Sequence, residues 1–192
     1  IGDSHTHYSL NPEYIPHTFN YASDSSTYIE NYYEVKDIFD RGIKVDTVVL
    51  QISSHGFSSM VIENGGTVAR NSWRYHKIVP LTDLKILTGY SYPEIIIFSY
   101  FPFIQSGKDF FVNKIEMNEQ ILGWQKGLAD FSKIDMDEKA RRTVEGHFLN
   151  KTVPERKVFN YYIKLLQLLK SNQIKVIFVK YPLSKYYSNY AL

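Results

Sequence analysis

Two stretches of the chain carry apolar residues at the three- and four-residue spacing of an amphipathic helix. The first follows the polar run Ser23–Ser26, which is able to cap a helix, and ends at Arg41-Gly42. The second runs from Glu155 to Leu169. The pattern predicts two helices, each with one buried face. The apolar positions are Tyr28, Tyr32, Val35, Ile38 and Phe39 in the first helix and Val158, Tyr161, Tyr162, Leu165, Leu166 and Leu169 in the second.

Continuous runs of apolar and β-branched residues predict strands. Val45–Ile52 is such a run, as expected for a strand that is covered on both faces, and Ile174–Val179 reads as another central strand. Thr18–Ala22 is a shorter β-prone run, and Ile1-Gly2 reads as the tail of a buried strand that has lost its beginning. Strands that alternate with helices predict an α/β domain, with a central parallel sheet between layers of helices.

The part of the chain from about residue 56 to residue 145 is not placed by this pattern. We treat it as an insertion within a single domain of residues 1–192. The aromatic-rich run Tyr92–Phe103 fits a buried helix, a strand or a flap over a substrate, because it is too short for periodicity to decide. Asp135–His147 is charged and predicts a surface helix. With no starting methionine and no closing helix, the chain is expected to be truncated at both ends.

Composition narrows the classes of function. An apolar content of 44 % is sufficient for a packed core, and a net charge of +2, spread along the chain, gives no case for a nucleic-acid partner. The absence of cysteine excludes disulfides, thiolate metal sites and cysteine nucleophiles from this chain. No apolar run approaches the roughly 18 residues that a membrane-spanning helix needs.

The candidate chemistry begins at Gly2-Asp3-Ser4-His5, because ligands of parallel sheets sit beyond the carboxyl ends of the strands. A serine in a turn at this edge can present its hydroxyl, and the Ser4 N–H can face a developing oxyanion. Gly2 would allow close backbone approach, and Asp3 can tie the loop by accepting backbone N–H bonds. The alternative is a strand-ending turn that has no chemistry.

Gly2–Thr6, taken with Leu10–Tyr14, Phe19–Ala22 and Val48–Ser53, resembles the SGNH (GDSL-type) hydrolase superfamily. Within it, the chain is similar to the branch found in bacterial exopolysaccharide and capsule gene clusters. The resemblance covers roughly residues 1–60 and returns around residues 158–187. It implies a three-layer, flavodoxin-like α/β/α sandwich, a serine nucleophile at Ser4, no cofactor, and a location outside the cytoplasm or in the cell envelope.

The chain departs from the family pattern in three blocks. In the loop after the second strand, Ser25 stands nearest to the place of an oxyanion-hole glycine, and its N–H could donate. After the third strand, Ser54 or His55 stands where the family has an asparagine. The Asp-x-x-His block, which supplies the base that activates the serine, occurs nowhere in the chain. We attribute this to truncation and expect the base to lie outside this sequence.

The histidines of the chain offer further candidates. His5 is next to Ser4, and because neighbouring side chains diverge, it is expected to border the pocket rather than act as the base. His55 is a candidate oxyanion donor or substrate contact, and His147 is expected to be structural. His5-Thr6-His7 has no acidic third ligand spaced to complete a metal site, so no metal is predicted.

The sequence therefore predicts an esterase or O-acyltransferase that acts on an acylated, most simply acetylated, bacterial surface polysaccharide. Trp73 and Trp124 are candidate sugar platforms, and the tail Lys185–Tyr190 either borders the pocket or is a frayed end. The alternative is a catalytically inactive module of the same fold that binds glycans or serves in assembly, with Ser4 as a turn residue. A nucleotide-binding domain is disfavoured, because no glycine-rich loop follows the first strand.

Overall fold

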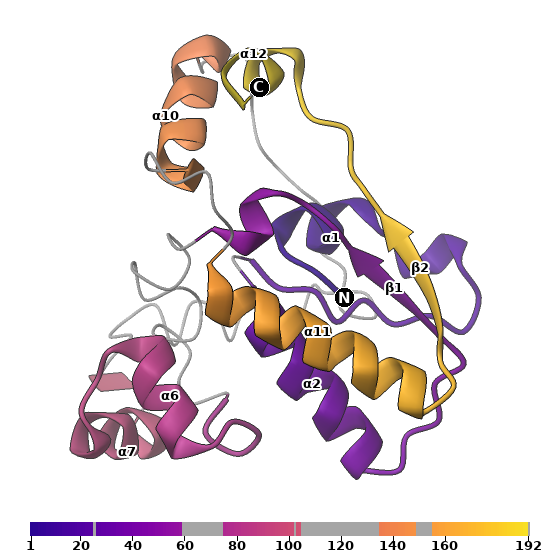
Figure 1. Ribbon diagram of the computed structural model, residues 1–192, viewed down its shortest axis with the longest axis vertical. Coiled ribbons are helices and arrows are strands. Elements are labelled where there is room, and N and C mark those ends of the chain that lie inside the picture. Colours follow the sequence, from indigo (N-terminus) through magenta and orange to yellow (C-terminus); the bar gives the residue numbers. More distant parts are fainter. Residues whose placement is uncertain (25, 59–74, 102, 105–134, 149–154, 192) are drawn as a thin grey trace.

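The protein is described from a computed structural model, which covers residues 1–24, 26–58, 75–101, 103–104, 135–148 and 155–191 (Figure 1). It is a mixed α/β structure in which two parallel strands pair in register, with Val49 opposite Ile177. The strands are β1 (Thr47–Gln51) and β2 (Lys175–Val179), and the helices are α1 (Ser4–Ser9), α2 (Tyr28–Asp40), α6 (Leu81–Thr88), α7 (Tyr92–Tyr100), α10 (Met136–Phe148), α11 (Arg156–Ser171) and α12 (Lys185–Ala191), with short 3-10 turns η1 (Pro12–Tyr14) and η2 (His55–Phe57).

The two strands differ in how far they are buried. Val48 and Leu50 of β1 belong to the core, as predicted for a covered strand. Ile177 and Phe178 of β2 are 42 % and 50 % exposed, so the prediction that this strand is central in the sheet is wrong for the described residues. The reason is that, among the described residues, β2 pairs with β1 alone and lies at the edge of the sheet.

The first residues of the chain lie against β1 on the side opposite β2. The Ile1 nitrogen donates to the Val49 carbonyl (2.8 Å), and the Gln51 N–H donates to the Ile1 carbonyl (3.2 Å). Ile1 thus bonds two residues of β1 that are two positions apart, Val49 and Gln51, which is the hydrogen-bond pattern of a parallel pair of strands. It places the turn that begins at Gly2 at the carboxyl end of β1.

The short run at residues 18–22 forms no strand, contrary to the β-prone reading of its sequence. The Asn20 amide explains this, because it donates to the carbonyls of Thr6 and Leu10 (both 2.9 Å) and accepts from the Ala22 N–H (3.0 Å). A side chain bonded to the backbone in this way competes with a strand ladder. One backbone bond, from the Ser23 N–H to the Gly2 carbonyl (3.3 Å), still connects this segment to the start of the chain.

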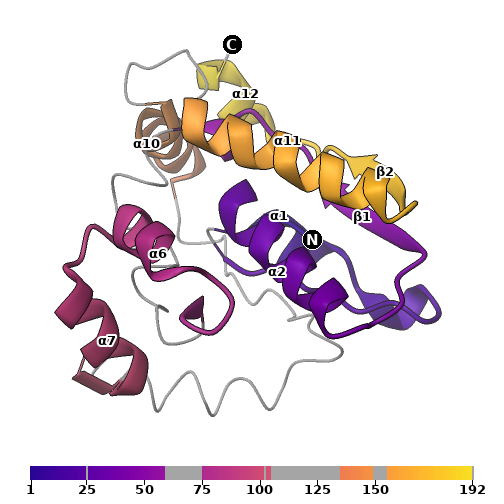
Figure 2. The same cartoon turned by 60° about the horizontal axis from the view of Figure 1, so that its bottom comes forward.

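Helices α2 and α11 pack side by side next to the sheet, and both were predicted (Figures 1 and 2). The cap of α2 is Thr27, whose hydroxyl accepts from the Ile29 N–H (3.0 Å), rather than the polar run before it. On α11, Val158, Tyr161, Leu165 and Leu169 are buried as expected, whereas Tyr162 and Leu166 of the predicted face are only partly buried. The core that joins these elements contains Ile29, Val35, Val48, Leu50, Val158, Tyr161, Leu165 and Leu169.

Residues 92–100 of the aromatic-rich run form the helix α7 and not a strand, but the helix is largely exposed, unlike the buried helix that the sequence also allowed. Ser91 caps α7, and Ile95 is fully buried while its neighbours Ile96 and Ile97 are each more than 40 % exposed. The charged segment after Asp135 forms α10, as predicted. Within the described residues no helix is both long and apolar enough to cross a membrane.

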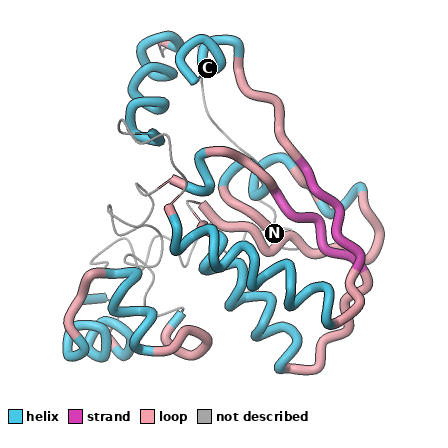
Figure 3. Tube along the Cα trace, viewed as in Figure 1, coloured by secondary structure: helices cyan, strands magenta, loops and turns pink. Residues whose placement is uncertain are grey.

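Helices α10 and α12 lie side by side at one end of the molecule, beyond the carboxyl ends of both strands (Figures 1 and 3). The Tyr190 hydroxyl of α12 donates to the Asp137 carboxylate of α10 (2.7 Å). This end of the sheet is where the sequence placed its candidate chemistry.

Candidate functional site

The turn between Gly2 and α1 is held by the side chain of Gln51, the last residue of β1. The Gln51 Oε1 accepts from the Asp3 N–H (3.2 Å) and from the Thr6 hydroxyl (2.8 Å). A Cβ at Gly2 would lie 2.4 Å from the Thr6 Oγ1 and 2.7 Å from the Gln51 Oε1. Only glycine fits here, so the close approach predicted for Gly2 is present, and it fixes the position of Asp3.

Asp3 caps α1 and holds two histidines. Its Oδ1 accepts from the His5 N–H (2.8 Å) and lies 3.0 Å from the His5 Nδ1. Its Oδ2 lies 2.7 Å from the Nε2 of His55, which comes from η2, just after β1. The Asp3 side chain is 11 % exposed, and that of His55 is 12 % exposed. Two segments that are about fifty residues apart in the chain therefore meet on one buried carboxylate.

The hydrogen bonds decide the charge of Asp3. Burial raises the pKa of its carboxyl, but the bonds from His5 and His55 outweigh burial and hold that pKa well below its ordinary range. A charged carboxylate only accepts hydrogen bonds, so the His5 Nδ1 and the His55 Nε2 are both donors. The same bond raises the pKa of His5 above its ordinary value, against the lowering effect of burial.

His147 of α10 completes the group of imidazoles, although the sequence assigned it a structural place. Its ring stacks on that of His55, with the centroids 4.7 Å apart and the planes 16° apart. Its Nδ1 lies 2.8 Å from the Tyr187 hydroxyl of α12. Burial lowers the pKa of His147 to about 4, with the neighbouring His55 and His5 adding to the effect. His147 is therefore neutral at physiological pH.

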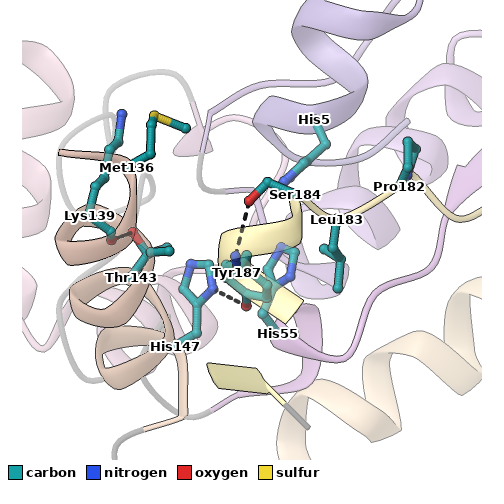
Figure 4. Close-up of a pocket in the computed structure, with 11 residues that line it drawn as sticks. His5, His55, Met136, Lys139, Thr143, His147, Pro182, Leu183, Ser184 and Tyr187 are labelled. Atoms are coloured by element: carbon teal, nitrogen blue, oxygen red, sulfur yellow. Dashed lines mark hydrogen bonds between the residues drawn. The ribbon is translucent and has the colours of Figure 1, made fainter. Parts of the chain in front are cut away.

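A cavity of about 300 Å³ opens beside these side chains (Figure 4). Its wall combines the histidines with apolar and hydroxyl-bearing residues of α10, α12 and the segment that precedes α12. Tyr187 belongs to α12, so the tail Lys185–Tyr190 borders the pocket as a helix, and the expectation that no helix closes the chain after the last strand is wrong. The cavity is lined by His5, His55, Met136, Lys139, Ala140, Thr143, His147, Pro182, Leu183, Ser184 and Tyr187.

The structure brings together only part of the set predicted from sequence. Asp3, His5 and His55 meet, and Ser4 is the first residue of α1, directly between two of them in the chain. Ser54 is exposed at the start of η2, where its side chain makes no cap bond. The side chain of Ser4, all of Ser25, and the two tryptophans proposed as sugar platforms, Trp73 and Trp124, lie outside the described parts of the chain.

An Asp–His pair is present within the chain, although its residues do not have the Asp-x-x-His spacing. Asp3 bonds His5 across a spacing of two residues, and it bonds His55 through the fold. A signal was available for the first contact, because an aspartate at a helix N-cap lies close to the residue two positions on. The contacts of His55 and His147 depend on packing between distant segments and have no local signal.

The same contacts bring together a different set of possible metal ligands from the one that the sequence indicated. From the sequence, His5 and His7 were the nearest pair of possible metal ligands, and no acidic residue was spaced to complete a site with them. In the structure the His7 ring bonds Asp24 instead (3.0 Å), while Asp3 and His55 join His5. Each of these three offers one ligand atom, and the atoms all lie within 4.8 Å of one another. The Ser53 hydroxyl lies 3.5 Å from the His55 Nε2, the nitrogen that already contacts Asp3, so these residues form no serine–histidine–aspartate relay.

Comparisons of the chain with protein-family models, with curated proteins and with solved structures find no match.

Proposed function

We propose that this chain is the core of an SGNH-type serine esterase or O-acyltransferase, which acts on an acylated bacterial surface polysaccharide and uses Ser4 as its nucleophile. One observation carries the proposal: the Asp3 carboxylate, next to Ser4 in the chain, holds two histidines beside a cavity. Acyl transfer needs these parts together, namely a hydroxyl, an oriented imidazole and room for the acyl group. The three-layer sandwich of that superfamily belongs to the same proposal, and the parallel pairing of β1 and β2 is compatible with it.

The sequence pattern disfavoured His5 and placed the base outside this chain. The bond between His5 and Asp3 supports a different proposal, in which His5 is the base. With its Nδ1–H donated to Asp3, the lone pair is on Nε2, as in serine hydrolases that use a histidine base. Consecutive residues on a helix point about 100° apart. Transfer from the Ser4 hydroxyl to the His5 Nε2 is therefore proposed to pass through one bridging water, which general-base catalysis tolerates.

The reaction then runs in two balanced halves. As the Ser4 Oγ bonds the acyl carbonyl carbon, its proton passes to His5, and the alcohol of the donor leaves with that proton. Water or a sugar hydroxyl next gives its proton to His5 and attacks the acyl-serine, and the Ser4 oxygen leaves with that proton. The oxyanion is assigned to the N–H groups of Ser4 and Ser25. His55 is assigned to holding Asp3, because its N–H is already donated to that carboxylate.

The lining of the cavity supports an acylated sugar as the substrate. Met136, Ala140 and Leu183 offer apolar contact to an acyl group, whereas Thr143 and Ser184 offer hydroxyls to a sugar ring. A volume of about 300 Å³ is at the lower end of small-molecule sites, so a short acyl chain on one sugar unit is the favoured occupant.

A serine-directed fluorophosphonate probe tests the nucleophile. We expect the chain to be labelled at Ser4 and the Ser4→Ala variant to lose the label. Ser9→Ala is the matched control, because Ser9 lies on the same helix, is exposed, and should leave labelling unchanged. Hydrolysis of p-nitrophenyl acetate, measured on the same proteins, should fall in parallel.

Two outcomes would overturn the proposal. Label that persists in Ser4→Ala places the nucleophile elsewhere. A folded chain that takes no label and hydrolyses no ester favours instead the inactive glycan-binding or assembly module. His5→Gln should slow labelling by at least about 100-fold, the scale on which general bases contribute.

A further inference from the structure

The contacts of Asp3, His5 and His55 arrange three ligand atoms of the kind that bind transition metals. Each residue offers one carboxylate oxygen or ring nitrogen, and these atoms all lie within 4.8 Å of one another. The His5 Nδ1 and the His55 Nε2 are the ring nitrogens that contact the Asp3 carboxylate. The ring centroids of the two histidines are 5.3 Å apart. Asp3 is the N-cap of α1, His5 lies in the first turn of α1 and His55 begins η2, so the three atoms come from two separate segments near the carboxyl end of β1.

The donor set selects the class of metal. Two imidazoles and one carboxylate with an open fourth position are the ligands of catalytic zinc sites, whereas magnesium and calcium prefer oxygen alone. Tetrahedral bonds of about 2.1 Å separate neighbouring donors by about 3.4 Å. The His5 Nδ1 lies 3.0 Å from the Asp3 Oδ1, and the His55 Nε2 lies 2.7 Å from the Asp3 Oδ2, so each nitrogen would move away from the carboxylate by about 0.4–0.7 Å.

The surroundings hold the carboxylate in place and leave one side open. The Gln51 side chain bonds the Asp3 N–H. The backbone at Gly2 packs directly against the Gln51 and Thr6 side chains, so the turn that carries Asp3 cannot move closer to β1. His5 and His55 both line the cavity, so the fourth position of a bound ion would face it. On binding, the N–H proton of each histidine moves to its other nitrogen, and no net proton is released by a neutral ring.

We propose that Asp3, His5 and His55 bind one Zn²⁺ ion or a similar divalent transition metal. This goes beyond the proposed acyl transfer and does not depend on it, since binding needs neither Ser4 nor a substrate. His5 cannot act as the base and as a metal ligand at the same time, because a metal on its Nδ1 replaces the hydrogen bond to Asp3. Zinc would then inhibit the ester hydrolysis that we propose.

Calorimetric titration tests the site on tag-free, EDTA-treated protein. We expect one equivalent of Zn²⁺ to bind, Co²⁺ to give the visible bands of a tetrahedral complex, and Mg²⁺ not to compete. His55→Gln and Asp3→Asn should each weaken Zn²⁺ binding by at least about 100-fold, since even second-shell changes cost 10–100-fold. His17→Gln, at an exposed histidine outside the cluster, should leave the affinity unchanged.

Imidazole ¹⁵N spectra keep the test decisive if a variant folds poorly. In the unaltered protein, Zn²⁺ should shift the His5 Nδ1 and the His55 Nε2 and leave the His17 ring unaffected. Absence of binding, equal binding by His55→Gln, or shifts confined to other histidines would each overturn the site. The fluorophosphonate labelling above is done in EDTA, so failure of either proposal leaves the other standing.

Discussion

Each oxygen of the Asp3 carboxylate has its own histidine, and this division determines the behaviour of the whole site. Oδ1 takes the His5 Nδ1–H and also the His5 backbone N–H, whereas Oδ2 takes the His55 Nε2–H. The carboxylate therefore fixes a helix start, a ring orientation and a long-range contact at once. Removing its charge should disturb all three.

The first prediction concerns the titration of His5. Its bond to Asp3 raises its pKa in the folded state, so the contribution of this pair to stability is complete below the ordinary pKa of about 6.5 and is lost as pH rises through the raised value. An NMR titration should show a His5 midpoint above 6.5. Asp3→Asn should bring it down, and Asp40→Asn, at the exposed end of α2, should not. A His5 midpoint at or below 6.5 would contradict the assigned contact.

The second prediction concerns Gly2. Gly2→Ala adds a methyl group that meets Gln51 and Thr6 below contact distance, and overpacking of this kind costs about 1–3 kcal/mol. Gly42→Ala is the matched control, because that glycine also has a positive φ (70°) but its added methyl group meets nothing within 4 Å. Denaturant unfolding measures both. We expect only Gly2→Ala to change the His5 titration, and a change from Gly42→Ala would contradict this reading.

At the scale of elements, α6 is tied to α2 and α11 by one carboxylate. Asp83 of α6 accepts from the hydroxyls of Tyr33 of α2 and Tyr161 of α11. Burial raises the pKa of Asp83, but these two hydroxyls outweigh it and the net pKa is lowered. The stabilisation is thus present above the ordinary pKa of aspartate and is lost as pH falls through the lowered one.

The third prediction follows from this contact. Tyr161→Phe removes one donor to the charged Asp83 and also the contact between the Tyr161 and Tyr33 hydroxyls (3.1 Å), and should lower the free energy of unfolding by about 1–3 kcal/mol at neutral pH. Tyr32→Phe is the control, because the Tyr32 hydroxyl has no hydrogen-bond partner among the described residues. The loss should shrink when unfolding is measured in acid. A loss that is the same at every pH would argue against Asp83 as the acceptor.

On the scale of the whole molecule, the core joins β1 to the helices α2 and α11 and continues to Leu84 of α6 and Ile95 of α7. Leu50 is fully buried there, so Leu50→Ala should lower the free energy of unfolding by about 2–5 kcal/mol, as core truncations do. Phe178→Ala, at a half-exposed position of β2, should cost clearly less. Equal losses, measured by denaturant unfolding, would mean that β2 is covered in solution.

Helices and strands could be predicted where the spacing of apolar residues continued over a long enough stretch of neighbouring residues. Helices α2, α10 and α11 and both strands follow from spacing and apolar runs. The prediction of a strand at residues 18–22 fails because the Asn20 side chain bonds the α1 segment and accepts from the Ala22 N–H, which a strand would need. The burial of β2 could not be predicted, since an apolar run does not tell how many strands will pair with it.

The candidate site was predictable only up to its first segment. Asp3 and His5 lie within two residues, so their contact has a local cause. His55 reaches Asp3 only because β1 ends beside the turn, and His147 reaches His55 only because α10 packs on α12. Contacts of this kind depend on chain topology, which spacing in the sequence does not encode.

The outer side of β2 also governs how the protein behaves in concentrated solution. Among the described residues this strand pairs with β1 alone, and unpaired N–H and C=O groups can template a strand from another molecule. Ile177 and Phe178 would favour such self-association, whereas Lys175 and Lys180, one at either end of the apolar run, oppose it by mutual repulsion. Salt screens these lysines. Light scattering by concentrated samples should therefore increase with ionic strength.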